Sequence, residues 1–111
     1  MAGKKERDLL RELDARLLKG LIQIFLLRMI ENGHSYGYEM MKICCSPGDK
    51  KVSSGLLYST LNWLEKDGYL NSKWVHDTSK PRKRYSITSK GDKLLEGGSS
   101  LIKRKIEEIV G

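Results

Sequence analysis

Residues 53–88 read SSGLLYSTLNWLEKDGYLNSKWVHDTSKPRKRYSIT, and this stretch decides the fold because the spacing of its apolar residues changes half-way along. The leucines from Leu57 to Leu64 recur at helical spacing, which predicts a helix that ends at the following glycine. Residues 69–76 and 84–88 then alternate apolar and polar side chains and predict two strands. The stretch therefore predicts a helix followed by a β-hairpin with a protruding tip.

The chain upstream of this stretch is predicted to be helical. A charged arm with leucines at helical spacing begins near residue 6. A wider apolar stripe over residues 18–30 predicts a helix that is mostly buried, with Phe25 in the core of the protein. The alternative is that Phe25 lines a cavity. Ser35 is expected to cap a further helix, which ends in a polar loop over residues 46–51.

The chain downstream of the hairpin predicts one last helix, capped by Thr88 or Ser89. Gly97 and Gly98 interrupt its apolar stripe and are expected to kink or loosen it, because a glycine costs about 1 kcal/mol in a helix relative to alanine. The element order is then helix, helix, helix, strand, strand, helix. This order predicts a mostly α protein with a small β-hairpin (an α+β fold), in the winged helix-turn-helix arrangement.

The 111 residues suffice for one domain with a modest core. Within it we distinguish an N-terminal arm over residues 1–17, a winged-helix core over residues 18–88 and a C-terminal dimerisation helix over residues 89–111. The arm and the last helix carry more apolar side chains than a free terminal helix should expose. The expected dimer contacts are Leu9, Leu10, Leu13, Leu101, Ile102, Ile106, Ile109 and Val110. The alternative is that the last helix folds back on its own subunit.

The net charge of +7 is concentrated in one segment of the chain. Residues 73–93 hold seven basic side chains against two acidic ones, and this segment includes the predicted hairpin. A focused basic patch is typical of a protein that meets phosphate. The basic side chains at or beside the hairpin tip are Lys80, Arg82, Lys83 and Arg84. We expect them to straddle a phosphate backbone or to enter a minor groove.

The helix predicted over residues 53–67 presents a small and polar surface opposite its leucines. This surface can approach a DNA major groove closely, with Asn62 in reach of base edges. The free N–H groups at Ser53 and Ser54 favour phosphate. The exposed side is expected to comprise Gly55, Ser59, Asn62 and Lys66, with Tyr58 and Trp63 on its flanks.

The sequence has no recognisable motif for catalysis or for metal binding. His34 and His76 have no recognisable catalytic partner, and the adjacent Cys44 and Cys45 lack the spacing of a zinc site. We therefore predict no enzyme activity, no metal and no cofactor. The charged N-terminus has no apolar segment behind it, and no stretch is long enough to span a bilayer. A cytoplasmic protein associated with the nucleoid is expected.

Four stretches of the chain resemble the PadR-like transcriptional regulators in order and spacing. They are LKGLIQIFLL from Leu18, YGYEMM from Tyr36, SSGLLYSTLNWLEKDGYL from Ser53 and KPRKRYSITSKG from Lys80. The resemblance implies a winged-helix homodimer held by its terminal helices, usually a repressor of nearby genes. The single C-terminal helix is similar to the short subfamily, which lacks a long effector-domain extension.

The resemblance also implies positions at or near DNA, namely Tyr38, Ser53, Gly55, Tyr58, Arg82 and Lys83. Leu56 and Ser59 stand where the family commonly has Thr and Pro, so the family's base preference is not carried over. Some relatives hold flat aromatic drugs between aromatic side chains at the dimer centre. The predicted C-terminal helix has no aromatic residue, so a small-molecule effector is not indicated.

Together these features predict a sequence-specific regulator of transcription, most simply a repressor, which binds double-stranded DNA. A twofold dimer would read an inverted repeat with half-sites roughly 34–36 Å apart. Two alternatives are a winged-helix module that binds another protein and a nonspecific architectural DNA-binding protein. The first alternative requires an apolar exposed face on the helix over residues 53–67, where the sequence has polar side chains.

Overall fold

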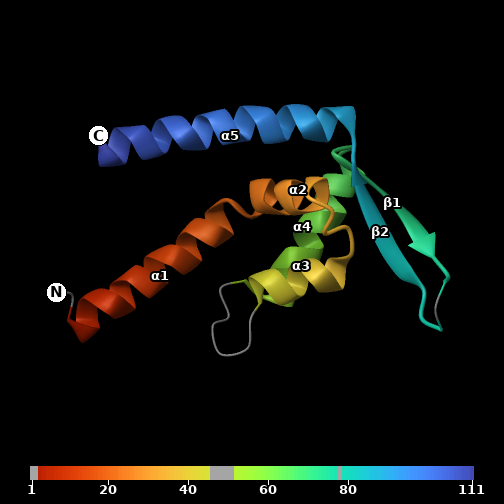
Figure 1. Ribbon diagram of the computed structural model, residues 1–111, viewed down its shortest axis with the longest axis horizontal. Coiled ribbons are helices and arrows are strands. Elements are labelled where there is room, and N and C mark those ends of the chain that lie inside the picture. The colour runs from red at the N-terminus through yellow and green to blue at the C-terminus, as the bar shows by residue number, and fades with distance from the viewer. Residues whose placement is uncertain (1–2, 46–51, 78) are drawn as a thin grey trace.

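The computed structural model describes residues 3–45, 52–77 and 79–111, so the predicted loop over residues 46–51 lies outside the described part of the chain. The described residues form five helices and one hairpin, with one helix more before the hairpin than predicted (Figure 1). The predicted arm and buried helix are two separate helices, because the chain turns at Leu21. The elements are α1 (Lys4–Gly20), α2 (Ile22–Glu31), α3 (Gly37–Cys44), α4 (Ser54–Lys66), β1 (Leu70–Val75), β2 (Arg82–Ile87) and α5 (Ser89–Val110).

The hairpin is antiparallel, and its register pairs Leu70 with Ile87 at the base and Val75 with Arg82 near the tip. A third segment joins its edge, since the backbone N–H of Tyr85 donates to the carbonyl of Ser35 at 2.8 Å and residue 36 bridges to residue 84. The hairpin is thereby fixed to the start of α3. This is the wing of a winged helix-turn-helix fold, as predicted.

Local capping explains where the helices begin. The Ser53 hydroxyl accepts from the Leu56 N–H at 3.1 Å, and the Thr88 hydroxyl accepts from the Gly91 N–H at 3.0 Å. The predicted cap at Ser35 is wrong. Its hydroxyl donates to the carbonyl of Gly33, and α3 begins instead with the Glu39 carboxylate accepting from the Tyr36 N–H.

The core lies where α2, α3 and α4 meet the base of the hairpin and the first half of α5. The side chains with least exposure come from all of these parts, which makes one continuous apolar interior. The most deeply buried are Leu26, Leu27, Met40, Val52, Leu57, Leu61, Leu64 and Leu70. Phe25, predicted to be part of the core, is exposed on α2, because the wide apolar stripe of this helix reaches beyond the face that packs inward.

The predicted kink at Gly97 and Gly98 is wrong, since α5 runs unbroken from Ser89 to Val110. The glycines of α5 instead permit close packing. A Cβ atom on Gly98 would lie 2.4 Å from Cδ1 of Ile24 on α2, and one on Gly91 would lie 2.2 Å from the Tyr69 carbonyl oxygen. The first half of α5 therefore packs on its own subunit, and the second half extends beyond it (Figure 1).

Candidate nucleic-acid interface

The outer face of α4 is small and polar. Leu57, Leu61 and Leu64 face the core, which turns the opposite side of the helix to solvent. As predicted from the helical period, the residues exposed on α4 and its cap include Ser53, Ser54, Gly55, Ser59, Asn62 and Lys66. Tyr58 and Trp63 are also exposed, on the flanks of this face. The surface has the width and polarity needed to enter a major groove.

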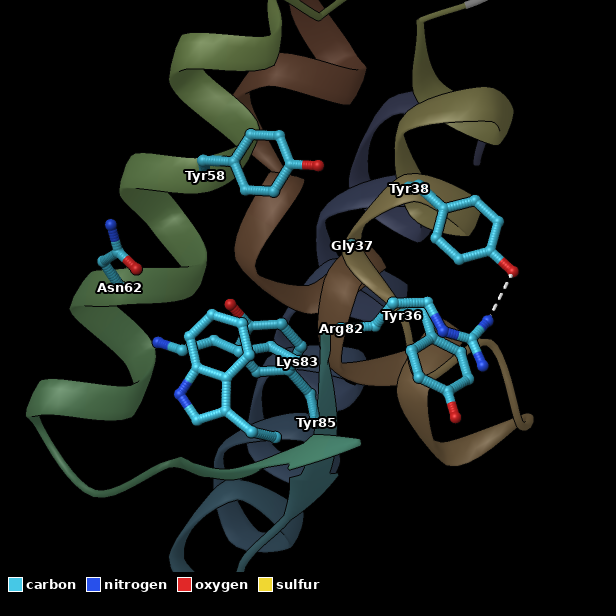
Figure 2. A pocket seen from close by; sticks show the side chains of 9 residues that line it. Tyr36, Gly37, Tyr38, Tyr58, Asn62, Arg82, Lys83 and Tyr85 are labelled. Atoms are coloured by element: carbon cyan, nitrogen blue, oxygen red, sulfur yellow. Dashed lines mark hydrogen bonds between the residues drawn. The ribbon is translucent and has the colours of Figure 1, made fainter. Parts of the chain in front are cut away.

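A trough of about 430 Å³ separates α4 from the hairpin and from the start of α3. Its walls are mainly aromatic, with two cations and one amide at its rim (Figure 2). The lining residues are Tyr36, Gly37, Tyr38, Tyr58, Asn62, Trp74, Arg82, Lys83 and Tyr85. The trough brings together the predicted DNA-binding residues Tyr38, Tyr58, Asn62, Arg82 and Lys83 from three elements that are far apart in sequence.

Arg82 is held on three sides. Its Nη2 donates to both carboxylate oxygens of Asp77, at 3.1 and 3.5 Å, and its Nη1 donates to the Tyr38 hydroxyl at 3.3 Å (Figure 2). The guanidinium lies over the Tyr36 ring, 4.4 Å from its centre. The hydrogen bond to Asp77 is the main reason that the pKa of Arg82 is raised above its ordinary value. Arg82 is thus a fixed cation.

Lys83 is held by α4. Its Nζ lies 3.5 Å from a carboxylate oxygen of Glu65 on α4 and 5.7 Å from the centre of the Trp74 ring. Glu65 in turn accepts a hydrogen bond from the Ser72 hydroxyl on β1. The Glu65 carboxylate therefore ties α4 to both strands of the hairpin and fixes the angle between them.

The position of Tyr58 depends on a close approach at Gly37. A Cβ atom on Gly37 would lie 2.8 Å from Cε1 of Tyr58 and 3.3 Å from its hydroxyl oxygen. The absence of a side chain there lets the Tyr58 ring lie against the start of α3. Tyr38, one residue further on, keeps its ring exposed, and the Lys42 ammonium lies 5.5 Å from the ring centre.

The remaining basic side chains of the wing differ in position from Lys83. The register pairs Lys73 with Arg84, and alternation along the strands places them on the face opposite Trp74 and Lys83. Both are exposed, and neither side chain forms an ion pair with another described residue. Lys80 is exposed in the segment between the strands. The predicted basic wing is therefore two-sided.

Three partners of the predicted cations were missed by the sequence pattern, namely Tyr36, Glu65 and Asp77. Glu65 precedes Lys83 by 18 residues, a separation that no local period connects. Asp77 and Arg82 flank the segment between the strands, so a predicted hairpin could have paired them. The interface is accordingly less positive than a count of its basic residues indicates.

A second candidate interface lies at the opposite end of the molecule. An apolar groove of about 770 Å³ runs between α1 and α5, over α2 and the end of α3. Its apolar lining includes Leu17, Leu18, Leu21, Phe25, Met29, Ile43, Leu101, Ile102, Ile106 and Ile109. Ile102 is half-buried, and the other predicted dimer residues of the two helices are exposed.

Comparison with known proteins gives the chain its family. The sequence model of the transcriptional regulator PadR-like family matches residues 26–97, which span α2, α3, α4, the hairpin and the start of α5. The chain belongs to the PadR-like family. It is therefore a DNA-binding transcriptional regulator rather than an enzyme, as the sequence predicts.

Solved PadR-like structures share the whole architecture. A PadR family regulator from Eggerthella lenta has a TM-score of 0.77 and 24% identity, over 96% of this chain and 94% of that one. A PadR family regulator from Clostridium difficile has a TM-score of 0.67 and 25% identity, over 82% of this chain and 99% of that one. A transcriptional regulator from Clostridium thermocellum has a TM-score of 0.67 and 29% identity, over 86% and 96% of the two chains.

A comparison with the curated proteins found no match for this PadR-like chain. Among the described residues, no helix has the length and apolar character to cross a membrane. No group of three or more potential metal ligands lies together in the same part of the chain.

Proposed function

We propose that this PadR-like regulator acts as a homodimer on an inverted repeat and represses transcription from the site it occupies. The observation that carries the proposal is the separation of its two surfaces. The polar face of α4 and the trough lie at one end, and the apolar groove between α1 and α5 lies at the other (Figure 1). Two copies can therefore pair through the groove and leave both α4 helices free.

The dimer contact is supported by the exposed apolar side chains of α1 and α5. Leu9, Leu10 and Leu13 continue the groove along α1, and Ile109 and Val110 continue it along α5. Exposed apolar surface of this extent is costly unless a partner covers it. A second copy of α1 and α5 offers a matching apolar surface, as twofold symmetry requires. The partner is therefore the protein itself.

The DNA contact is divided between α4 and the wing. We assign base reading to Asn62 and close backbone approach to Ser53, Ser54, Gly55, Ser59 and Lys66. Tyr38, Tyr58 and the wing residues Lys80, Arg82, Lys83 and Arg84 are assigned to the phosphates. The DNA is that of the nucleoid, in the cytoplasm. The two α4 helices of the dimer would contact half-sites roughly 34–36 Å apart. A dimer that covers both half-sites at a promoter would block access of the transcription machinery.

The proposal is tested by selecting genomic fragments with the purified protein and measuring mobility shifts of the best fragment at two salt concentrations. Enrichment of one inverted repeat, with binding that survives competitor DNA, is the expected result. Weak binding to every fragment with strong salt dependence would favour an architectural protein. Absence of duplex binding at both salt concentrations would favour a module for another protein.

The contribution of the wing is tested by the double variant Arg82→Ala, Lys83→Ala. We expect weaker binding to every duplex alike and a salt slope flatter by about one or two phosphate contacts. The matched control is Lys103→Ala, Arg104→Ala on α5, which removes two exposed cations that do not line the apolar groove. An unchanged slope in the wing variant would remove Arg82 and Lys83 from the phosphate contact.

A further inference from the structure

The two cations that line the trough are each already paired with a carboxylate of the same chain. We propose that Asp77 and Glu65 compete with DNA phosphates for Arg82 and Lys83, and thereby lower the affinity of the protein for duplex DNA of any sequence. The inference rests on the proposed docking of α4 and the wing on DNA.

The competition at Arg82 follows from the donors that Asp77 occupies. Asp77 accepts from Nη2, and Tyr38 accepts from Nη1, so both ends of the guanidinium fork are in use. The Arg82 side chain is 28% exposed, whereas that of Asp77 is 62% exposed. An approaching phosphate can therefore reach Nη2 when the Asp77 side chain rotates away. The Tyr36 ring keeps the guanidinium in place during the exchange.

The competition at Lys83 has a different character because Glu65 is fixed. One carboxylate oxygen of Glu65 lies 3.5 Å from the Lys83 Nζ, and the other accepts from Ser72. The Glu65 side chain is 30% exposed and lies on a helix rather than beside a turn. This carboxylate stays beside Lys83 when DNA arrives, and its charge repels any phosphate that Lys83 attracts.

The wing also carries two basic side chains outside the trough. Lys73 and Arg84 are direct cross-strand neighbours, and neither forms an ion pair with another described residue. Like charges in such a pair destabilise the hairpin slightly. The two wing cations that line the trough thus have a carboxylate partner, whereas Lys73 and Arg84 outside the trough form no ion pair with another described residue.

The two carboxylates should affect both the affinity for DNA and its dependence on salt. Affinity that comes from phosphate contacts does not depend on sequence, and its salt slope is about 0.9 per phosphate neutralised. A cation whose charge is partly offset by a neighbouring carboxylate contributes less to this slope than the same cation without that carboxylate. Removal of the carboxylate charge should therefore raise the affinity for the operator and for unrelated duplexes by a similar factor. The salt slope of binding should steepen, and the base preference should change little.

The test compares Asp77→Asn and Glu65→Gln with the wild-type chain, on the selected operator and on an unrelated duplex of equal length. Both substitutions keep the shape and the hydrogen-bond acceptor, so the hairpin should remain folded, and thermal unfolding checks this. We expect each variant to bind both duplexes about fivefold more tightly, from the strength of one ion pair near the surface. Each salt slope should steepen by about one.

The matched control is Glu12→Gln, which removes a carboxylate that is paired with Arg16 on α1, far from the trough (Figure 1). We expect its affinity to stay within about twofold of wild type at physiological salt, because charges separated by more than a Debye length are largely screened. Asp77→Asn carries the test alone if Glu65→Gln is destabilised, since Asp77 is exposed.

The outcomes separate this inference from the proposed function. Operator enrichment by the wild-type chain decides the proposed function, and the variants decide the role of the carboxylates. Affinities and slopes that match the Glu12→Gln control would overturn the competition. Weaker binding by Asp77→Asn would also overturn it, because Asp77 would then be a residue that positions Arg82 for DNA. A wild-type chain that binds no duplex would overturn both.

Discussion

The two ends of the molecule differ in what they expose. At the α4 and hairpin end, the exposed side chains are mainly polar or charged; of the aromatic ones, Tyr38 and Tyr58 carry a hydroxyl and Trp74 lies beside Lys83. At the α1 and α5 end, the exposed side chains include Leu9, Leu13, Leu101 and Ile109, with 82% of Ile109 exposed. The difference indicates two partners of different chemistry, one polyanionic and one apolar.

The two ends of the molecule are joined by α5. The first half of α5 lies on α2 through Gly98, and Gly91 packs against the base of the hairpin at Tyr69. The second half of α5 leaves the core and carries the apolar groove. One helix therefore fixes the distance between the polar end and the apolar end of the molecule.

The largest expected effect comes from breaking the apolar end. Ile106→Glu places a carboxylate in the apolar groove, where it would be buried against a second copy at high cost. We expect a monomer in analytical ultracentrifugation and a loss of at least about a hundredfold in operator affinity, because the second half-site no longer adds avidity. Ser100→Glu, which adds the same charge to α5 outside the groove, should remain dimeric. A dimeric Ile106→Glu variant would place the contact elsewhere.

A second prediction tests how α5 is fixed to the core. Gly91→Ala should lower the free energy of unfolding by about 3 kcal/mol, because the new methyl group meets a backbone oxygen that cannot move aside. Gly97→Ala meets nothing within 4 Å and should raise it by about 1 kcal/mol through helix propensity. Urea unfolding measures both. Equal effects of the two substitutions would contradict the close packing at Gly91.

A third prediction sharpens the role of the polar end. Asn62→Ala should change the preference between operator variants by about 1–3 kcal/mol at one base pair, because an amide can read a base edge through two hydrogen bonds. Competition binding against operators mutated one position at a time measures this preference. Ser59→Ala, on the same face of α4, should weaken binding with little change in preference. A uniform loss across all operators would reduce Asn62 to a backbone contact.

The sequence predicted the features of the fold that depend on neighbouring residues. The caps at Ser53 and Thr88, the leucine face of α4 and the alternation of the hairpin are local patterns, and the structure has each of them. The exposed polar face of α4 followed from the same period. The assignment of individual residues to DNA stays a prediction.

The features that the sequence did not predict depend on packing between distant segments. Gly98 was expected to loosen α5, but Ile24 occupies the space beside it and makes a glycine suitable there. Phe25 was expected in the core, but the position of α1 and α5 leaves it at the groove. Glu65 and Lys83 pair only because the hairpin returns to α4. Such contacts have no signature in local spacing.

The smallest expected effect concerns the two cysteines at the end of α3. Cys44 is 3% exposed, and burial, with a smaller effect of Cys45, raises the pKa of its thiol. Cys45 is half-buried and donates to the Val52 carbonyl at 2.6 Å.

Cys44 lies under the apolar groove, so its reaction with a maleimide at neutral pH requires local opening at this end of the molecule. We expect Cys45 to react on the order of tenfold faster than Cys44, because burial limits access to Cys44 and raises the pKa of its thiol. Cys45→Ser should abolish the fast phase and Cys44→Ser should keep it. Equal reaction rates in the two single variants would mean that Cys44 is as accessible to the maleimide as Cys45. This result would contradict a rigid core beneath the apolar groove.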